Sequence, residues 1–163
     1  MNDPVAELFD EFRRDHQVMG RGLFEIATAL KAEDDQKAAE AARALDVVAG
    51  PHIRFEELYF YPELRGLLGD PTVERFESEH REGLAAVLRL SRLEKNAVLT
   101  TEEREQSRDQ IDTMRVHTDE CGEHFGALGR FPKQQQKNLL SALRRLRRAG
   151  GRWTEQSRGR TSE

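Results

Sequence analysis

The sequence has a single cysteine, five prolines, few aromatic residues and no long apolar run, and the first and last of these shortages each exclude a class of protein. One thiol, that of Cys121, cannot form an intramolecular disulfide, so the chain is not a disulfide-stapled secreted scaffold. No stretch approaches the ~18 consecutive apolar residues that a membrane span requires. The N-terminus leads into an amphipathic segment without the apolar core of a signal peptide. We therefore expect a cytoplasmic protein that makes no membrane contact.

The composition is that of a helical protein with charged outer faces. Hydrophobic residues make up 37% and charged residues 34% of the 163 residues, enough for one domain with a core of its own. The formal net charge of −4 gives no reason to expect nucleic-acid binding. We find neither a nucleophile triad nor a phosphate-binding loop. The composition thus predicts an all-α fold.

Caps and turn residues divide the chain into five predicted helices. Four long helices are expected at about 4–31, 35–68, 71–94 and 101–128, and a shorter fifth helix at about 132–149. Short connections between the long helices favour an up-down-up-down four-helix bundle with the fifth helix packed across it. We assign residues 1–150 to this bundle and expect residues 151–163 to be a flexible polar tail.

One stretch of the second helix carries an unusual pair of side chains. His52 and Glu56 are four residues apart, so an imidazole and a carboxylate lie on the same helix face. That face is the inner one, because apolar residues precede the pair at steps of three and four. Pro51 removes a backbone donor just before the pair and should bend the helix there. Tyr59 lies on the same stripe and could hydrogen-bond a bound species.

All five histidines fall on the inner stripes of the four long helices: His16, His52, His80, His117 and His124. A lone core histidine usually needs only a hydrogen-bond partner, but five in one core are harder to satisfy. Counted from the predicted turns at ~1.5 Å per residue, the first four of them reach nearly one level of the bundle. Glu56 falls at the same level. Four helices therefore converge on one polar layer.

Imidazoles and a carboxylate in a bundle core are typical ligands of iron, manganese or zinc. Four histidines divide into two for each of two ions, and Glu56 can lie between the ions. This arrangement leaves open positions for a small diatomic or peroxidic ligand.

In these features the sequence resembles the hemerythrin-like HHE cation-binding family over about residues 4–129. The resemblance is carried by His16, by His52-x-x-x-Glu56 with Leu58-Tyr59-Phe60-Tyr61-Pro62, by Glu79-His80 and by His117. It implies that the four histidines are terminal ligands and Glu56 a bridging carboxylate of a non-haem diiron centre.

Two positions depart from the family pattern. Phe76 occupies the place of an additional histidine found in the oxygen-carrying hemerythrins, which argues against reversible oxygen carriage. Cys121 stands four residues after His117, where the family usually repeats the glutamate. Glu120 is rotated by about −60° from His117, and His124 lies ~10 Å further along the helix, so both are weaker replacements. Cys121 itself has three interpretations: a small buried hydrophobe, a thiolate ligand, or a redox-active thiol near the metal.

The leading hypothesis is a diiron protein that binds or reacts with oxygen, peroxide or nitric oxide, as a sensor or scavenger or through catalase-like peroxide removal. We expect it to be a monomer or a small homo-oligomer. One alternative is a metal- or redox-responsive interaction module with a mononuclear or structural site. In that module the basic fifth helix, with Arg144, Arg145, Arg147 and Arg148, would bind an acidic partner.

Overall fold

The computed structural model describes residues 3–156, and over this range the chain is helical and contains no β-strand. The all-α prediction is therefore confirmed. The long helices are α1 (Pro4–Lys31), α2 (Asp35–Phe55), α4 (Asp70–Ser91) and α5 (Thr101–His124). The shorter elements are the π-helix η1 (Glu56–Phe60), α3 (Tyr61–Leu68), the 3-10 helix η2 (Phe125–Arg130), α6 (Lys133–Ala149) and α7 (Trp153–Gln156).

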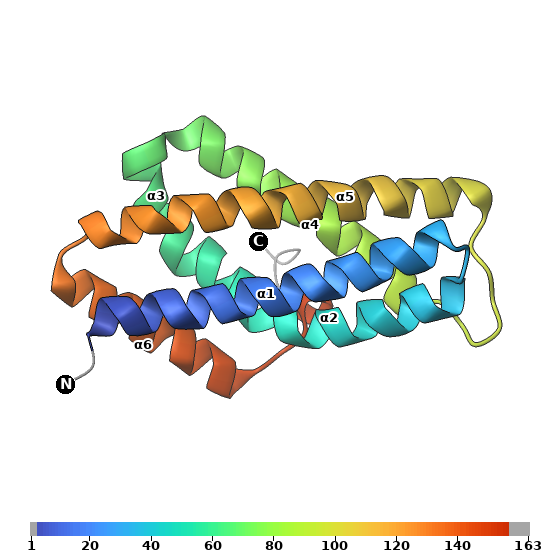
Figure 1. The fold of residues 1–163 in the computed structure, drawn as a ribbon, viewed down its shortest axis with the longest axis horizontal. Helices are drawn as coiled ribbons and strands as arrows, with labels where there is room; N and C mark the ends of the chain where they lie inside the picture. Colours follow the sequence, from blue (N-terminus) through green and yellow to red (C-terminus); the bar gives the residue numbers. More distant parts are fainter. Residues whose placement is uncertain (1–2, 157–163) are drawn as a thin grey trace.

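The four long helices pack in a ring around a shared core. Helix α1 packs against α2 and α5, and α4 packs against the same two helices from the other side (Figure 1). Short turns join α1 to α2 and α3 to α4, whereas a longer loop at residues 92–100 leads from α4 into α5. The inner faces of the four long helices therefore line one shared core.

The helix ends follow from local side-chain chemistry. Asp3 accepts the N–H of Val5 at 3.1 Å, and Pro4 opens α1 because its missing N–H would have no partner there. Thr100 and Glu103 form a reciprocal capping box at the start of α5, with bonds of 3.1 and 2.9 Å. These short-range signals are the reason that the predicted helix starts fall close to the observed ones.

The core consists of two apolar clusters with a polar layer between them. One cluster, which includes Leu23, Leu45 and Leu90, fills the end where α1 turns into α2. The other is rich in aromatic residues and fills the end covered by α3 and α6, with Phe12 and Phe60 among its members. The polar layer holds four buried or nearly buried histidines from four helices, at the level that their positions along the helices predict.

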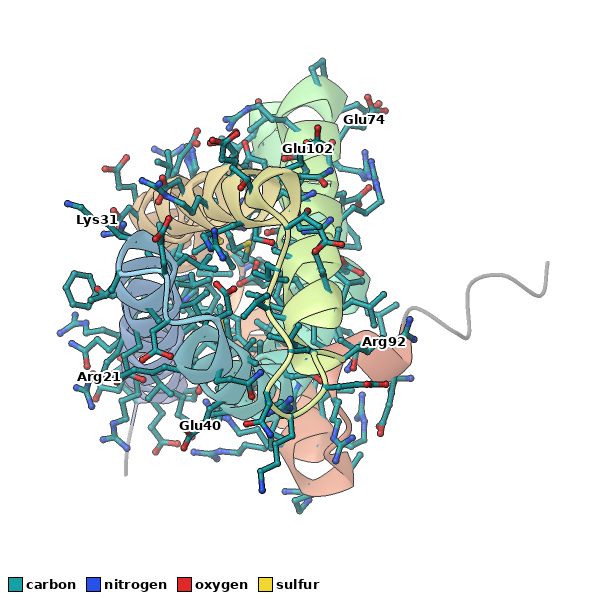
Figure 2. The ribbon with its side chains drawn as sticks, turned by 90° about the vertical axis from the view of Figure 1, so that its right-hand side faces the viewer. Arg21, Lys31, Glu40, Glu74, Arg92 and Glu102 are labelled. Carbon is teal, nitrogen blue, oxygen red and sulfur yellow. The ribbon has the colours of Figure 1, made fainter. Side chains whose placement is uncertain are left out.

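The outer faces carry the charge. Figure 2 shows the bundle from the end where α1 joins α2, with the side chains of Arg21, Lys31, Glu40, Glu74, Arg92 and Glu102 pointing outward; all six are exposed. In the described part of the chain, no helix has the length and apolar character needed to cross a membrane.

Helix α6 is joined to α1 by ion pairs. Arg144 donates to Glu7 at 2.7 Å and to Glu11 at 2.9 Å, and Arg147 also pairs with Glu11. Arg145 lies over the ring of Tyr59. Three of the four arginines that we considered for binding an acidic partner therefore contact residues of their own chain.

Residues 151–156 belong to the segment that we predicted to be a flexible tail, but they pack against α2 and α4. Trp153 is buried, and both Thr154 donors, its N–H and its hydroxyl, bond to Asp46 at 2.8 and 2.7 Å. The prediction failed here because it weighed the polar neighbours more than the one large apolar ring. Residues 157–163, the rest of that tail, lie outside the described range.

Gly50 is a point where this segment packs closely against α2. A Cβ built there would lie 2.1 Å from the carbonyl oxygen of Gly151 and 2.9 Å from the carbonyl carbon of Arg152. We expect Gly50→Ala to displace the segment and to cost about 2 kcal/mol, as overpacking does. Trp153 is the only tryptophan, so its fluorescence should shift to longer wavelength as the ring meets water.

Gly66→Ala is the matched control, because a Cβ at Gly66 on helix α3 meets nothing within 4 Å. This variant should keep the wild-type emission and gain up to about 1 kcal/mol from helix propensity. Wild-type emission and stability in Gly50→Ala would contradict the proposed contact.

Asp35 links the start of α2 to the loop before α5 and to α5 itself through hydrogen bonds. Its carboxylate accepts two hydrogen bonds from Arg104, at 2.9 and 2.7 Å, and one from the N–H of Leu99 at 2.9 Å. The hydrogen bonds from Arg104 lower the pKa of the buried Asp35 carboxyl group. The folded state therefore gains stability from the charged carboxylate above the unfolded pKa of about 4 and loses it as the pH falls below that value.

We expect Asp35→Asn to lower the melting temperature at pH 7 by roughly 5 °C, because charge-assisted hydrogen bonds to a buried group are lost. The difference from wild type should shrink as the pH falls from about 4 to 3. Thermal unfolding at several pH values measures both effects. Glu33 is 3.7 Å from the same arginine but 75% exposed, so Glu33→Gln should change little. An equal effect of both variants would refute the role assigned to Asp35.

Candidate metal centre

Glu56 lies at the middle of the polar layer, with histidines on both sides of its carboxylate. Its Oε1 atom is 2.5 Å from Nε2 of His52 and 3.8 Å from Nε2 of His16. Its Oε2 atom is 3.4 Å from Nε2 of His80, which in turn lies 2.9 Å from Nε2 of His117. The structure thus brings together the five residues that the sequence predicted as ligands, each with a donor atom that faces the same space.

Carboxylates hold the outer nitrogens of these histidines. Nδ1 of His52 lies 2.8 Å from Asp15, and Nδ1 of His80 lies 3.1 Å from Glu57. A neutral imidazole has one N–H, so an Nδ1 that donates to a carboxylate leaves Nε2 with a lone pair. This pattern of a carboxylate behind a histidine is typical of metal-binding histidines, because it fixes both the tautomer and the ring orientation.

The other two histidines are held in the same way. Nδ1 of His117 is 2.7 Å from Glu79, and Nδ1 of His16 is 3.0 Å from the backbone oxygen of Phe12. All four Nε2 atoms therefore point inward while all four Nδ1 atoms have acceptors.

The two carboxylates beside His52 attract positive charge to it. Burial lowers the pKa of His52, but Glu56 and Asp15 outweigh burial and raise that pKa to about 9. Burial likewise opposes ionisation of Glu56, yet His52 and His80 keep the pKa of Glu56 well below its ordinary value. A proton on His52 or a cation bound to its Nε2 can supply the positive charge that the carboxylates require.

Two of the other histidines favour the neutral, metal-binding form. Burial and the nearby charge of His52 lower the pKa of His16 to about 4. Burial also lowers the pKa of His117, although Glu79 opposes this. For Glu79, burial acts to raise the pKa, but its bonds to His117 and Arg75 outweigh burial. The pKa of Glu79 is therefore lowered, and its carboxylate remains charged.

The donor set fits a metal ion. Nε2 of His52 is buried and has no hydrogen-bond partner among the described residues, although Glu56 is close, because the contact lacks hydrogen-bond geometry. When Nδ1 of His80 and Nδ1 of His117 each donate a hydrogen to a carboxylate, the two Nε2 atoms that face each other carry lone pairs and no hydrogen. Three donor atoms from Glu56, His80 and His117, and three from His16, Glu56 and Cys121, each lie within 4.8 Å of one another. A cation in this layer would relieve both lone-pair contacts.

Tyr61 is a member of the cluster, although we assigned it no role from the sequence. Its hydroxyl donates to Oε2 of Glu56 at 2.5 Å and lies 3.0 Å from His80 and 3.2 Å from His117. Burial and the charge of Glu56 raise the pKa of Tyr61 well above its ordinary value, so the hydroxyl keeps its proton. The π-helix η1 explains the position, because its wider turn brings the fifth residue after Glu56 back to the same face.

The same π-helix overturns the prediction for Tyr59. A regular α-helix would carry Tyr59 on the inner stripe, but the extra residue per turn rotates it outward. There its hydroxyl accepts a bond of 2.9 Å from Arg145. The irregularity that shapes the site therefore lies at residues 56–60 and begins at Glu56 itself, and α2 continues through Pro51.

Two of the three less certain candidates lie away from the cluster. Glu120 is bound by both terminal nitrogens of Arg75, at 2.9 and 2.5 Å, because its position on α5 is rotated toward the surface. His124 packs with its ring centroid 5.7 Å from that of Phe76, one turn too far along α5. Cys121 alone is in the cluster, with Sγ 3.5 Å from Oε2 of Glu56.

Sequence reasoning also missed Asp15 and gave Glu57 and Glu79 no specific role. A signal was present, because each of these residues is directly adjacent in sequence to a cluster residue. However, each one supports a histidine on a different helix: Asp15 on α1 supports α2, Glu57 in η1 supports α4, and Glu79 on α4 supports α5. Such pairs can be assigned only when the helix order around the bundle is known.

Comparison with known proteins agrees with this geometry. The family model of the hemerythrin HHE cation binding domain matches residues 7–125, which include every residue of the cluster. Neither the curated proteins nor the solved structures contain a significant match.

Proposed function

The chain belongs to the hemerythrin HHE cation-binding domain family, and we propose that it holds two non-haem iron ions that bind or react with dioxygen, peroxide or nitric oxide. The four histidines would divide into two for each ion, with His16 and His52 on one side of Glu56 and His80 and His117 on the other. Glu56 would contribute one carboxylate oxygen to each ion.

One observation carries the proposal: four inward Nε2 atoms face a single buried carboxylate, and each matching Nδ1 atom has an acceptor. A structural hydrogen-bond network would satisfy the Nε2 atoms as well, but Nε2 of His52 has no such partner within residues 3–156. Arranging buried lone pairs toward one another costs stability unless a cation joins them. Metal binding is the function that uses this arrangement.

When bound, iron supplies Lewis-acid and one-electron redox chemistry toward small oxygen- or nitrogen-containing ligands. The residues of the chain orient the ligand atoms, exclude water from the site and hold a proton there. The apolar clusters on both sides of the layer exclude water, and Phe76 adds a wall beside His117, with ring centroids 5.2 Å apart. The Tyr61 hydroxyl holds a proton at the centre and can donate it in a hydrogen bond to a small ligand.

A pocket gives a small ligand a route to the layer from the side of His16. His16 is 11% exposed, whereas the other three histidines are 1–2% exposed. The pocket has a volume of about 470 Å³, and Gly20 on α1 and Gly122 on α5 are among its lining residues. Gly20 lies one helical turn after His16, so the absence of a side chain there leaves the ring accessible.

Metal analysis of protein purified without oxygen tests the proposal, followed by absorption spectra on addition of dioxygen, peroxide and nitric oxide. We expect two irons per chain and spectral changes with at least one of these ligands. Consumption of peroxide with release of oxygen would assign catalase-like activity. One ion per chain would favour a mononuclear site, and a protein that binds no iron would overturn the proposal.

We expect Gly20→Leu to slow the reaction with the small ligand several-fold without loss of iron. A Cβ at Gly20 meets nothing within 4 Å, so the leucine fits on α1 and its side chain fills the pocket. Stopped-flow absorption of the ferrous protein measures the rate. Gly66→Leu, on α3 and away from the pocket, is the control and should react at the wild-type rate. Unchanged kinetics in Gly20→Leu would exclude this route.

A further inference from the structure

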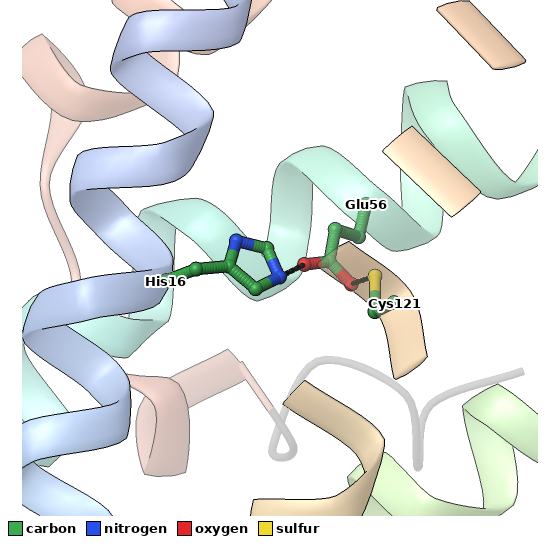
Figure 3. Close-up of side chains that lie close together, drawn as sticks. All are labelled: His16, Glu56 and Cys121. Carbon is green, nitrogen blue, oxygen red and sulfur yellow. Dashed lines mark hydrogen bonds and ion pairs between the residues drawn. The ribbon is translucent and has the colours of Figure 1, made fainter. Parts of the chain in front are cut away.

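Cys121 is the one fully buried thiol next to the candidate centre. It lies on α5 one turn after His117, with no exposed surface, and its Sγ is 3.5 Å from Oε2 of Glu56 and 4.0 Å from the Tyr61 hydroxyl. Figure 3 shows the carboxylate of Glu56 between the imidazole of His16 and the sulfur of Cys121. The Cys121 thiol donates a hydrogen bond to this carboxylate, so the sulfur makes a polar contact as well as apolar packing.

The distances suit a shared cation. The donor atoms of His16, Glu56 and Cys121 all lie within 4.8 Å of one another. Nitrogen and sulfur ligands bind a metal ion at about 2.0 and 2.3 Å, so two of them on one ion are at most about 4.4 Å apart. Small side-chain adjustments bring these three atoms to that range.

A second observation points to a cation at this place. Nε2 of His52 is buried, lacks a hydrogen-bond partner in the described part of the chain and lies 2.5 Å from Oε1 of Glu56. It faces the same carboxylate as Cys121 and His16, and a cation bound there would give it a partner. His52 lies on α2 and Cys121 on α5, so the position of this nitrogen is an observation independent of the cysteine.

Charge balance favours a second anionic donor. Asp15, Glu57 and Glu79 lie behind the histidines, and only Glu56 among these carboxylates faces the space between them, so a second anionic donor would lower the positive charge that two divalent ions bring into a dry core. Glu120, the carboxylate next to Cys121 in the sequence of α5, is bound at the surface by Arg75 and does not face the layer. Cys121 is the buried group on α5 that becomes an anionic donor when a metal ion displaces its proton.

We propose that Cys121 is a thiolate ligand of one of the two metal ions, through the donor group that it forms with His16 and Glu56. Binding breaks the S–H bond and forms a sulfur–metal bond, and the proton leaves to water. No change of oxidation state is needed. The inference rests on the proposed function, because it requires that the chain binds metal.

Cobalt(II) is the probe, since a thiolate bound to it produces a charge-transfer absorption that nitrogen and oxygen ligands do not. The metal-free full-length protein is loaded with cobalt(II), and metal content and absorption are measured together. We expect the band in the wild type, and its loss in both Cys121→Ser and Cys121→Asp. Cys121→Asp supplies a carboxylate of similar size, so it should retain the metal even if the serine variant folds poorly.

Met114→Leu is the matched control, because it removes another buried sulfur of α5 with little change of volume. It should keep the band. A wild-type protein that binds cobalt(II) without a thiolate band, or a band that survives in Cys121→Asp, would overturn the inference and leave the proposed function standing. Wild-type protein that binds neither cobalt(II) nor iron(II) would overturn both.

Discussion

Replacing Glu56 with glutamine is expected to weaken metal binding in both halves of the centre. The carboxylate faces His52 and His16 through one oxygen and His80 through the other, so a single side chain serves both sides. Glutamine keeps the shape but loses the charge and replaces one oxygen with an NH₂ group that cannot bind a cation. Since loss of a mere supporting residue already costs 10–100-fold in affinity, we expect at least a ~100-fold loss here.

Two measurements check this expectation. Metal analysis after dialysis should find two ions in the wild type and fewer than one in Glu56→Gln. Unfolding with and without iron(II) should show a gain of about 2.7 kcal/mol for wild type at a free metal concentration 100 times the dissociation constant, and almost none for the variant.

Glu40 provides the matched control, because it lies on the same helix as His52 and is exposed. Glu40→Gln makes the same chemical change and should bind metal like the wild type. If Glu56→Gln retained both ions with wild-type affinity, the carboxylate would have no role between the two sides.

Asp15→Asn is expected to reduce metal affinity by about 10–100-fold although Asp15 contacts no metal-facing atom. One Asp15 oxygen lies 2.8 Å from Nδ1 of His52 and accepts a bond of 2.6 Å from Arg147 on α6. Asparagine can keep one of these bonds, but it loses the charge that makes the imidazole a stronger ligand and holds its ring in place. Competition with a coloured chelator measures the affinity.

Asp10→Asn on the same helix makes the same change at an exposed position and should leave the affinity unchanged. Equal affinities for Asp15→Asn and the wild type would mean that His52 is positioned by packing alone.

The polar layer could be predicted from the sequence because regular helices obey a simple geometry. His16, His52, His80 and His117 lie on inner stripes, and 1.5 Å per residue places them at one depth from the turns. These two facts depend only on helix periodicity and on turns whose caps are visible in the sequence. They hold wherever the helix is regular.

Tyr61 could not be predicted in this way, because the helix around it is not regular. A π-turn changes which residue faces inward after Glu56, and Pro62, which follows this turn near the start of α3, does not show which residue that is. The burial of Trp153 was not predicted for another reason. It depends on two glycines that are distant in sequence: Gly50 leaves room for the backbone of the segment, and Gly83 leaves room for the indole ring. Both cases require knowledge of the packed structure.

The carboxylates that hold the histidines also restrict how the helices can move relative to one another. Asp15, Glu57 and Glu79 each stand beside a cluster residue on their own helix and bond to a histidine on the next one around the ring. If α1, α4 or the segment of α2 and η1 slid or rotated by one residue, it would lose its own inward residue and also release the histidine of its neighbour. Helix α5 holds no neighbouring histidine, but a shift of α5 would pull His117 away from Glu79 on α4. A change of register in one helix would therefore disturb a contact with a neighbour, and we expect the four helices to adopt the layer together.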